Sequence, residues 1–198
     1  MSLNFIIVSG VLGVDRHGVI KGLVHALHAG RGSRVAVIAS EHGPPCMDSP
    51  FISEHEVLAR DLRGGCVACS LKTDLIDCIR GILRDGQPDV IIFEPAGTAD
   101  PGIVRDALED CSGVAIDKVV SILVLDATLF YQTWRMFQRP LRNHVLQADL
   151  ALAFGLDAVS GAEREDIVEK LAGMGFQGQL CSVEEGCPDL SHLLSDLL

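Results

Sequence analysis

The sequence predicts an α/β fold, a three-layer sandwich in which helices cover both faces of a mostly parallel central sheet. Amphipathic segments of helical period alternate with apolar runs along the chain, and such alternation is typical of parallel sheets. The apolar runs have the length and β-branched content of buried strands. We expect strands at residues 3–8, 34–39, 89–93, 118–125, 148–154 and 178–182.

The segments between these strands predict the helices and loops. Residues 40–53 are rich in Gly and Pro and predict an irregular loop. Ser70 is the expected N-cap of a helix that ends near residue 84. Thr128 is the expected N-cap of a helix that ends near residue 145 and is kinked at Pro140. We expect further helices at residues 19–27, 54–63, 102–111, 161–174 and 189–198.

The composition indicates a single domain covering residues 1–198. With 22% charged residues and a mean hydropathy of +0.32, a buried core is favoured over disorder. No apolar run reaches the ~18 residues of a membrane span. The net charge of -11 argues against nucleic acid or an anionic membrane as a partner. Seven cysteines without a recognisable secretion signal predict reduced thiols in a cytoplasmic protein.

The N-terminal strand, turn and helix have the layout of a phosphate-binding P-loop. A glycine turn at residues 9–13 joins the first strand to the first helix. The pattern G-x-x-x-x-G-K-[ST], laid from Gly10, puts Asp15 on its second glycine, Arg16 on its lysine and His17 on its Ser/Thr. The order of strand, turn and helix therefore matches a P-loop, whereas the residues at three functional positions of the motif do not.

Five loops, taken in order, carry a family resemblance. Residues 9–20 read S-G-V-L-G-V-D-R-H-G-V-I, residues 65–70 read G-C-V-A-C-S, and residues 94–101 read E-P-A-G-T-A-D-P. Residues 124–127 read V-L-D-A, and the segment 147–157 begins Q-A-D and ends F-G-L-D. In this order they resemble the nucleotide-binding domain of the CobW/UreG/HypB family of SIMIBI-class P-loop GTPases, and the CobW branch fits best. The resemblance covers essentially the whole chain and implies the P-loop NTPase fold, without the C-terminal domain common in CobW proteins.

The resemblance implies a function and a set of site residues. It implies a nucleotide-binding accessory protein of metal-cofactor or cobalamin metabolism, in which GTP hydrolysis drives metal delivery to a client metalloenzyme or corrinoid protein. Glu94 matches the family's Mg²⁺-linked position and is the catalytic candidate. The nucleotide-binding positions carried over are Gly10, Val11, Leu12, Gly13, Val14, Asp15, Arg16, His17, Gly18, Gly97 and Asp157.

The departures from the family pattern argue against GTPase activity. Asp15 places a carboxylate where a β-phosphate would lie, and two like charges about 4 Å apart repel by about 4 kcal/mol at an effective dielectric constant of ~20. His17 lacks the hydroxyl that binds Mg²⁺, and Arg16 keeps the charge of lysine without its geometry. Phe154 and Gly155 replace the Asn-Lys pair that reads guanine. We therefore expect weak binding of GTP or GDP, and the alternative function is a non-hydrolysing pseudo-GTPase that acts as a metal-binding or scaffold module.

Two interpretations of Asp15 stay open. In the first, its carboxylate caps the following helix and occupies the anion site that a phosphate would use. In the second, Asp15 is a surface loop residue of a protein that still binds nucleotide loosely. Asp is a common N-cap residue, which favours the first interpretation.

Cys66 and Cys69 have the spacing of metal ligands and are candidates for Zn²⁺ or another thiophilic divalent ion. A closed zinc site needs four ligands, and the family's middle cysteine is Ala68 here. The missing ligands would come from Cys46, His42, His55 or the second subunit of a homodimer; the alternative is a pair of thiols without a metal. The other cysteines and histidines are expected to be packing, structural or solvent-facing residues: Cys78, Cys111, Cys181, Cys187, His25, His28, His144 and His192.

Overall fold

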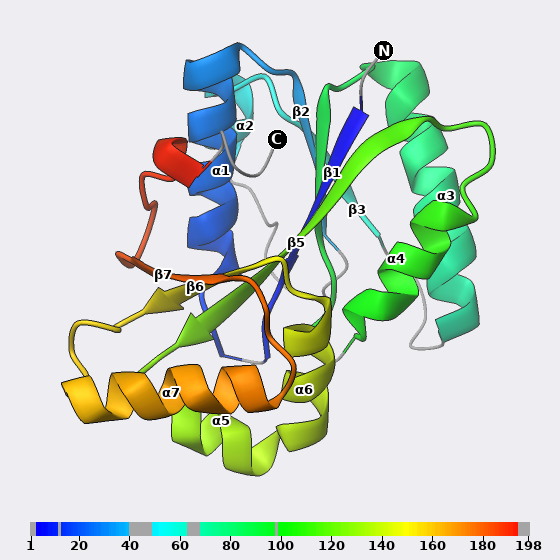
Figure 1. Cartoon of the computed structure of the whole chain (residues 1–198). Helices are drawn as coiled ribbons and strands as arrows, with labels where there is room; N and C mark the ends of the chain where they lie inside the picture. Colours follow the sequence, from blue (N-terminus) through cyan, green and yellow to red (C-terminus); the bar gives the residue numbers. More distant parts are fainter. Residues whose placement is uncertain (1–2, 12, 40–48, 63–67, 98, 194–198) are drawn as a thin grey trace.

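A computed structural model describes residues 3–11, 13–39, 49–62, 68–97 and 99–193. Its seven strands form one sheet in the order β3-β2-β4-β1-β5-β6-β7, and every neighbouring pair is parallel. Figure 1 shows helices on both sides of this twisted sheet. The predicted three-layer α/β fold is confirmed, with a sheet that is parallel throughout.

The elements follow one another as strand and helix along most of the chain. The strands are β1 (Leu3–Ser9), β2 (Val35–Ala39), β3 (Leu58–Asp61), β4 (Val90–Glu94), β5 (Ile116–Asp126), β6 (Leu150–Phe154) and β7 (Gln179–Val183). The helices are α1 (Arg16–Arg31), α2 (Ser49–Glu54), α3 (Ala68–Asp85), α4 (Pro101–Glu109), α5 (Phe130–Met136), α6 (Gln138–Gln147), α7 (Gly161–Gly173) and the 3-10 turn η1 (Ser191–Leu193).

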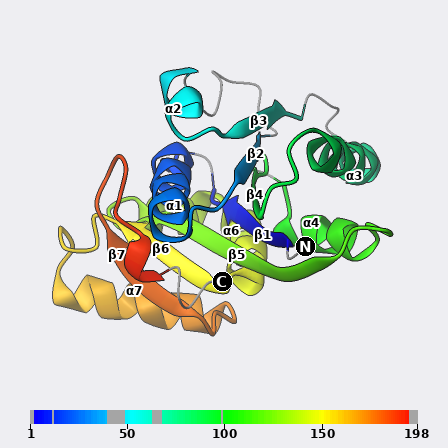
Figure 2. The same ribbon diagram turned by 90° about the horizontal axis from the view of Figure 1, so that it is seen from above.

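The core lies on both faces of the sheet because alternate side chains of each buried strand point to opposite faces. On one face, Ile6 and Val8 of β1 pack with the apolar stripe of α1 and with Leu193 of η1. On the other face, Phe5 and Ile7 pack against α3 and α4, while β5 and β6 pack against α5, α6 and α7. Figure 2 shows α1 and α3 on opposite sides of the sheet. Each fully buried Leu, Ile or Phe contributes about 1.5–3 kcal/mol.

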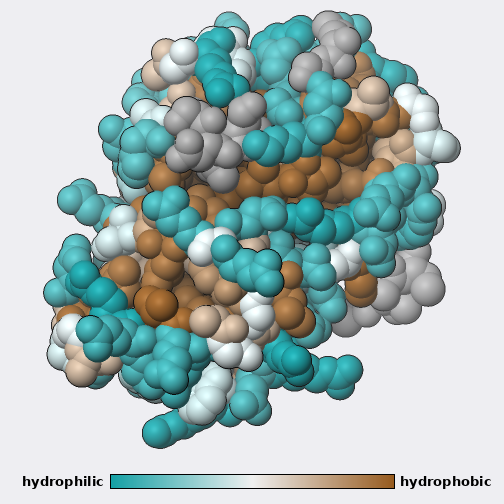
Figure 3. Space-filling model, in the orientation of Figure 1, coloured by the Kyte–Doolittle hydropathy of each residue, from teal (hydrophilic) through white to brown (hydrophobic). Residues whose placement is uncertain are grey.

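Hydrophilic residues cover most of the face seen in Figure 3, with hydrophobic residues showing between them. Within the described part of the chain, no helix has the length and apolar character needed to cross a membrane.

The segment after β2 differs from the prediction. Residues 40–48 lie outside the described residues, and the rest of the expected loop is helix α2. The helix expected at residues 54–63 is wrong: β3 occupies Leu58–Asp61 and pairs in parallel with β2, with Ala36 opposite Leu58. A short edge strand with one paired side depends on its neighbour rather than on its own periodicity, so the local pattern misled the prediction.

Three predicted helix boundaries also need correction. Helix α3 begins at Ala68, so Ser70 lies inside its first turn and is not the N-cap. The expected single helix after Thr128 is two helices that break at Phe137, and Pro140 lies in the first turn of α6, where proline is tolerated. The Thr128 hydroxyl donates to Asp126 Oδ1 at 2.6 Å instead of capping α5. The last expected helix is only the 3-10 turn η1 within the described residues.

Candidate phosphate-loop site

The candidate site lies where β1 and β4 end side by side at the carboxyl edge of the sheet. The two strands pair in parallel, with Ile7 opposite Phe93, so the loop after β1 and the side chain of Glu94 reach the same edge. Helix α1 begins there with Arg16 and His17. The turn needs Gly13, whose φ of +99° is disfavoured for other residues. The predicted strand, loop and helix are thus present.

Arg16 and Glu94 form a buried ion pair inside this loop. Arg16 Nε donates to Glu94 Oε1 at 2.8 Å, and Arg16 Nη1 donates to the carbonyl oxygen of Gly10 at 3.0 Å. The two residues are only 6% and 1% exposed. The guanidinium therefore bridges the beginning of the loop and the end of β4.

His17 is a second basic residue in contact with Glu94. His17 Nε2 lies 3.2 Å from Glu94 Oε2. The contact is close but not well aligned, since Oε2 has no hydrogen-bond partner of good geometry within the described residues. Interaction with Glu94 raises the pKa of His17, although partial burial opposes it. Burial raises the pKa of Glu94, but His17 and Arg16 outweigh burial, so that the pKa is lowered. The ionised form of Glu94 is therefore favoured by the Arg16 guanidinium and the His17 ring that flank it.

Asp15 is the N-cap of α1, as the sequence predicted. Its Oδ1 accepts a hydrogen bond from the backbone N–H of Gly18 at 2.9 Å. A carboxylate at this place meets both the unpaired N–H groups and the positive end of the helix dipole. The first turn of α1 thus has an anionic partner from its own chain.

A contact that the sequence did not reveal covers the first turns of α1. A Cβ at Gly18 would lie 1.8 Å from the carbonyl oxygen of Gly186, and one at Gly22 would lie 2.4 Å from that of Pro188. The segment that follows β7 thus lies directly on the helix, and only glycine leaves room for it. In the resembled pattern, Gly18 falls on a threonine, whose side chain would not fit here.

His144, expected to be either structural or solvent-facing, is only 1% exposed and lies close enough to Arg16 and Asp100 to feel their charges. Burial lowers the pKa of His144 to about 4, against the opposite effect of Asp100 and the Gly97 backbone. Neither ring nitrogen makes a well-aligned hydrogen bond within the described residues. Next to it, Asn143 Nδ2 donates to Asp100 Oδ2 at 2.9 Å, and Asp100 Oδ1 caps α4. The loop after Glu94 is therefore tied to α6.

The candidate base-reading residue, Asp157, is engaged by neighbouring side chains. Its Oδ1 accepts from Arg164 Nη2 at 2.9 Å, and its Oδ2 lies 3.4 Å from Ser182 Oγ. Its side chain is 83% exposed. Gly155, with a φ of +64°, makes the turn that precedes it.

Most of the predicted metal ligands lie outside the described residues. His42 and Cys46 lie in the segment 40–48, and Cys66 lies in the segment 63–67. Leu12, a candidate of the phosphate loop, also lies outside the described residues. Cys69 lies in the first turn of α3. Across the ranges that the structure describes, no three His, Cys, Asp or Glu residues are grouped so as to hold a metal ion. The thiolate site stays a prediction.

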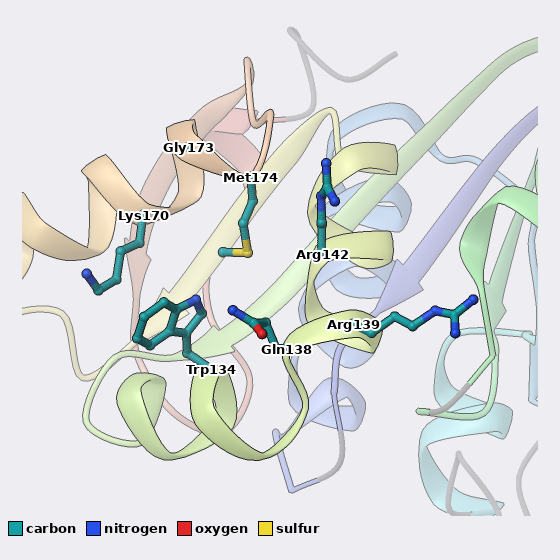
Figure 4. A pocket seen from close by; sticks show the side chains of 7 residues that line it. All are labelled: Trp134, Gln138, Arg139, Arg142, Lys170, Gly173 and Met174. Atoms are coloured by element: carbon teal, nitrogen blue, oxygen red, sulfur yellow. The ribbon is translucent and has the colours of Figure 1, made fainter.

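A cavity of about 560 Å³ lies away from the phosphate loop, between α5, α6 and α7. Figure 4 shows Trp134, Arg142 and Met174 around it. Lys170 Nζ lies 4.7 Å from the centre of the Trp134 ring and 3.0 Å from Asp166 Oδ1. None of its lining residues comes from the phosphate loop, so it is a separate feature of the molecule.

Comparisons with known proteins agree with this architecture. Residues 4–177 match the model of the CobW/HypB/UreG nucleotide-binding domain. The zinc chaperone YeiR of Escherichia coli strain K12 is 25% identical over 190 residues, which cover 95% of this chain and 57% of YeiR. The zinc chaperone YjiA of the same organism is 25% identical over 198 residues, which cover 96% of this chain and 60% of YjiA.

The fold is also that of a solved relative. The crystal structure of the Zn(II)-bound YjiA GTPase from E. coli superposes with a TM-score of 0.64 at 21% identity, over 94% of this chain and 59% of that one. The chain thus spans about three fifths of the length of these relatives.

Proposed function

Because the chain belongs to the CobW/HypB/UreG family, we propose that it is a metal-handling accessory protein whose nucleotide site is held closed by its own side chains. The two curated relatives are zinc chaperones, which favours Zn²⁺ as the metal and a metalloprotein as the client. The expected link to cobalamin has no such support and stays a prediction. GTP binding is weak and hydrolysis negligible in this proposal.

The buried pair of Arg16 and Glu94 is the observation that carries the proposal. A phosphate that enters the loop would have to draw the guanidinium away from Glu94, which is 1% exposed. The carboxylate would then be buried without its full compensation, and removing one partner of such a pair costs about 3–5 kcal/mol. The ion pair thus competes with a phosphate for the same cation.

Three further features of the loop also disfavour the binding of a nucleotide phosphate and its Mg²⁺. The Asp15 carboxylate already accepts from the N–H of Gly18, which would otherwise face an anion. His17 lacks a hydroxyl for Mg²⁺ and contacts Glu94, the residue at the Mg²⁺-linked position. The Gly186 carbonyl oxygen lies against Gly18 and adds a negative dipole there.

Calorimetric titration with GTP and GDP in the presence of Mg²⁺ tests the closed loop. The triple change Asp15→Gly, Arg16→Lys and His17→Thr restores the motif chemistry and is expected to raise nucleotide affinity measurably. It should also lower stability slightly, by roughly a few tenths of a kcal/mol for the replacement of the N-cap Asp15 by Gly. The change Arg60→Lys, in an exposed ion pair with Asp85, serves as the control. Micromolar GTP affinity with Mg²⁺-dependent turnover in the unaltered protein would contradict the proposal.

The metal part has its own test. We expect the purified protein to bind Zn²⁺ through the thiolates of Cys66 and Cys69, within one chain or across a homodimer. The double change Cys66→Ala and Cys69→Ala should lower the zinc content and, if the site is shared, the dimer fraction in light scattering. Unaltered metal content and an unaltered oligomeric state in this variant would show that the thiolate site is wrong.

A second candidate is GTP-driven metal delivery of the kind that the family resemblance implies. It is favoured by Glu94 and Gly97, which keep the family's Mg²⁺-linked and γ-phosphate-sensing positions. The titration with GTP separates the two candidates, because only this one requires tight binding and turnover.

A further inference from the structure

Three histidines lie together at the other end of α1, far along the helix from the phosphate loop. His25 and His28 are one turn apart on α1, and both are exposed. His55 directly follows α2, which lies beside α1 in Figure 2. The ring centre of His55 is 5.7 Å from the ring centres of both His25 and His28. Two elements thus bring the three imidazoles to one place on the surface.

Two nitrogens of this cluster already have the separation of metal ligands. His25 Nδ1 lies 3.4 Å from His55 Nε2. Two nitrogens on a tetrahedral zinc ion, with Zn–N bonds of about 2.0–2.1 Å, lie about 3.3–3.4 Å apart. The same distance fits a hydrogen bond between the two rings. The other contacts of His55 therefore have to show which of its ring nitrogens is available to a metal ion.

Two contacts with Phe51 orient the ring of His55. Its Nδ1 lies 3.2 Å from the carbonyl oxygen of Phe51, which suits donation from Nδ1–H. That bond leaves the lone pair on Nε2, the atom that faces His25. Metal-ligating histidines usually donate their second ring nitrogen to such a carbonyl, which orients the ring. The Phe51 ring stacks on His55 at 4.3 Å between centres and 22° between planes.

We propose that His25 Nδ1 and His55 Nε2 form the fixed pair of a surface site for a borderline divalent cation such as Zn²⁺, with His28 as the third ligand. Imidazole nitrogen suits Zn²⁺, Cu²⁺ and Ni²⁺ better than Mg²⁺ or Ca²⁺. His28 reaches the ion through a change of rotamer of its exposed side chain, since the described residues hold no three ligands already arranged around one point. Water completes the coordination.

The local charges are compatible with a cation. The carbonyl end of α1 carries the negative pole of the helix dipole, which favours positive charge near its last turn. Asp189 lies close enough to His25 and His192 for their charges to lower its pKa, after its hydrogen bonds to Ser191. The ammonium group of Lys21, whose Nζ lies 5.5 Å from the centre of the Phe51 ring, disfavours a cation nearby. A moderate rather than a tight affinity is therefore expected.

The proposed histidine site needs no thiolate ligand, so it is tested in a chain that lacks Cys66 and Cys69. The full chain carrying Cys66→Ala and Cys69→Ala is titrated with Zn²⁺ alone by calorimetry. His25→Ala and His55→Ala are each expected to weaken binding by about tenfold or more, because even supporting groups of a metal site are worth 10–100-fold, roughly. His28→Ala should weaken it less. His192→Ala, which removes a histidine of η1, is the matched control and should leave affinity unchanged.

Nuclear magnetic resonance of the ¹⁵N-labelled imidazoles in the unaltered chain gives a second measurement that does not depend on any substitution. Zn²⁺ should shift the resonances of His25 Nδ1 and His55 Nε2 together at a low molar ratio. Zn²⁺ binding that survives both His25→Ala and His55→Ala, equal weakening by His192→Ala, or unshifted ring nitrogens of His25 and His55 would each overturn the proposal. Absence of Zn²⁺ binding in the chain that carries Cys66→Ala and Cys69→Ala would overturn it as well.

Discussion

The two ends of helix α1 carry similar side chains in opposite environments. At its N-terminal end, Arg16 is 6% exposed and paired with Glu94, which is 1% exposed. Toward its C-terminal end, about 14 and 18 Å from Arg16 at 1.5 Å per residue, His25 and His28 are exposed and meet His55 at the surface. Arg16 and Glu94 are buried and bonded to each other, whereas the histidines lie at the surface with their ring nitrogens near solvent.

The difference shows how burial decides what a polar group does. A buried charge must be compensated, so Arg16 and Glu94 lock one another and stabilise the loop. An exposed imidazole has water as an alternative partner and exchanges it for a metal ion at little cost. The N-terminal end of α1 is thus best suited to holding structure, and the C-terminal end to binding.

The largest expected effect comes from breaking the buried pair. Glu94→Gln removes the carboxylate charge and leaves Arg16 buried without it, which should lower the free energy of unfolding by about 3–5 kcal/mol. Chemical denaturation measures this change. Asp89→Asn, in the exposed pair with Arg34, is the matched control and should cost about 0–1 kcal/mol. Equal effects of the two changes would show that burial does not determine how much the Arg16–Glu94 ion pair stabilises the fold.

A somewhat smaller effect concerns pH and the buried His144. Its folded-state pKa of about 4 lies below the ordinary value of 6.5, so the unfolded state binds the proton more readily. Its contribution to stability is therefore complete above pH ~6.5 and is lost as the pH falls toward ~4, by about 3 kcal/mol at roughly 1.4 kcal/mol per pH unit. Denaturation at a series of pH values measures the slope.

The matched variant for that series is His144→Gln, which should reduce the slope between those pH values. His28→Gln changes an exposed histidine of α1 and should leave the slope unaltered. A slope that His144→Gln leaves intact would assign the acid sensitivity to other groups.

The smallest effect compares two glycines of α1. In Gly18→Ala, the new Cβ meets the Gly186 carbonyl oxygen and Asp15, so stability should fall by about 1–3 kcal/mol. In Gly30→Ala, the Cβ enters open space near the other end of the helix, and stability should rise by up to about 1 kcal/mol. Thermal unfolding of the two variants should therefore shift in opposite directions. Shifts of the same sign would mean that the segment after β7 does not rest on α1.

Local patterns were enough to predict the fold and the ancestry of the candidate site. The apolar runs predicted β1, β2, β4, β5 and β6 because a buried strand needs a continuous apolar sequence wherever it lies in the sheet. Asp15 was predicted as an N-cap because the capped N–H belongs to Gly18, three residues away. The family was visible because its motifs are short contiguous loops, and residues 4–177 match it.

The tertiary structure alone decided the contacts between distant parts of the chain. Arg16 and Glu94 are 78 positions apart, and nothing in either segment shows that one will neutralise the other. The same holds for β3, which exists because β2 offers it an edge, and for the pair of His25 and His55, which depends on how α2 lies against α1. Periodicity and capping are properties of neighbours in sequence, whereas charge compensation and ligand geometry depend on which residues folding brings together.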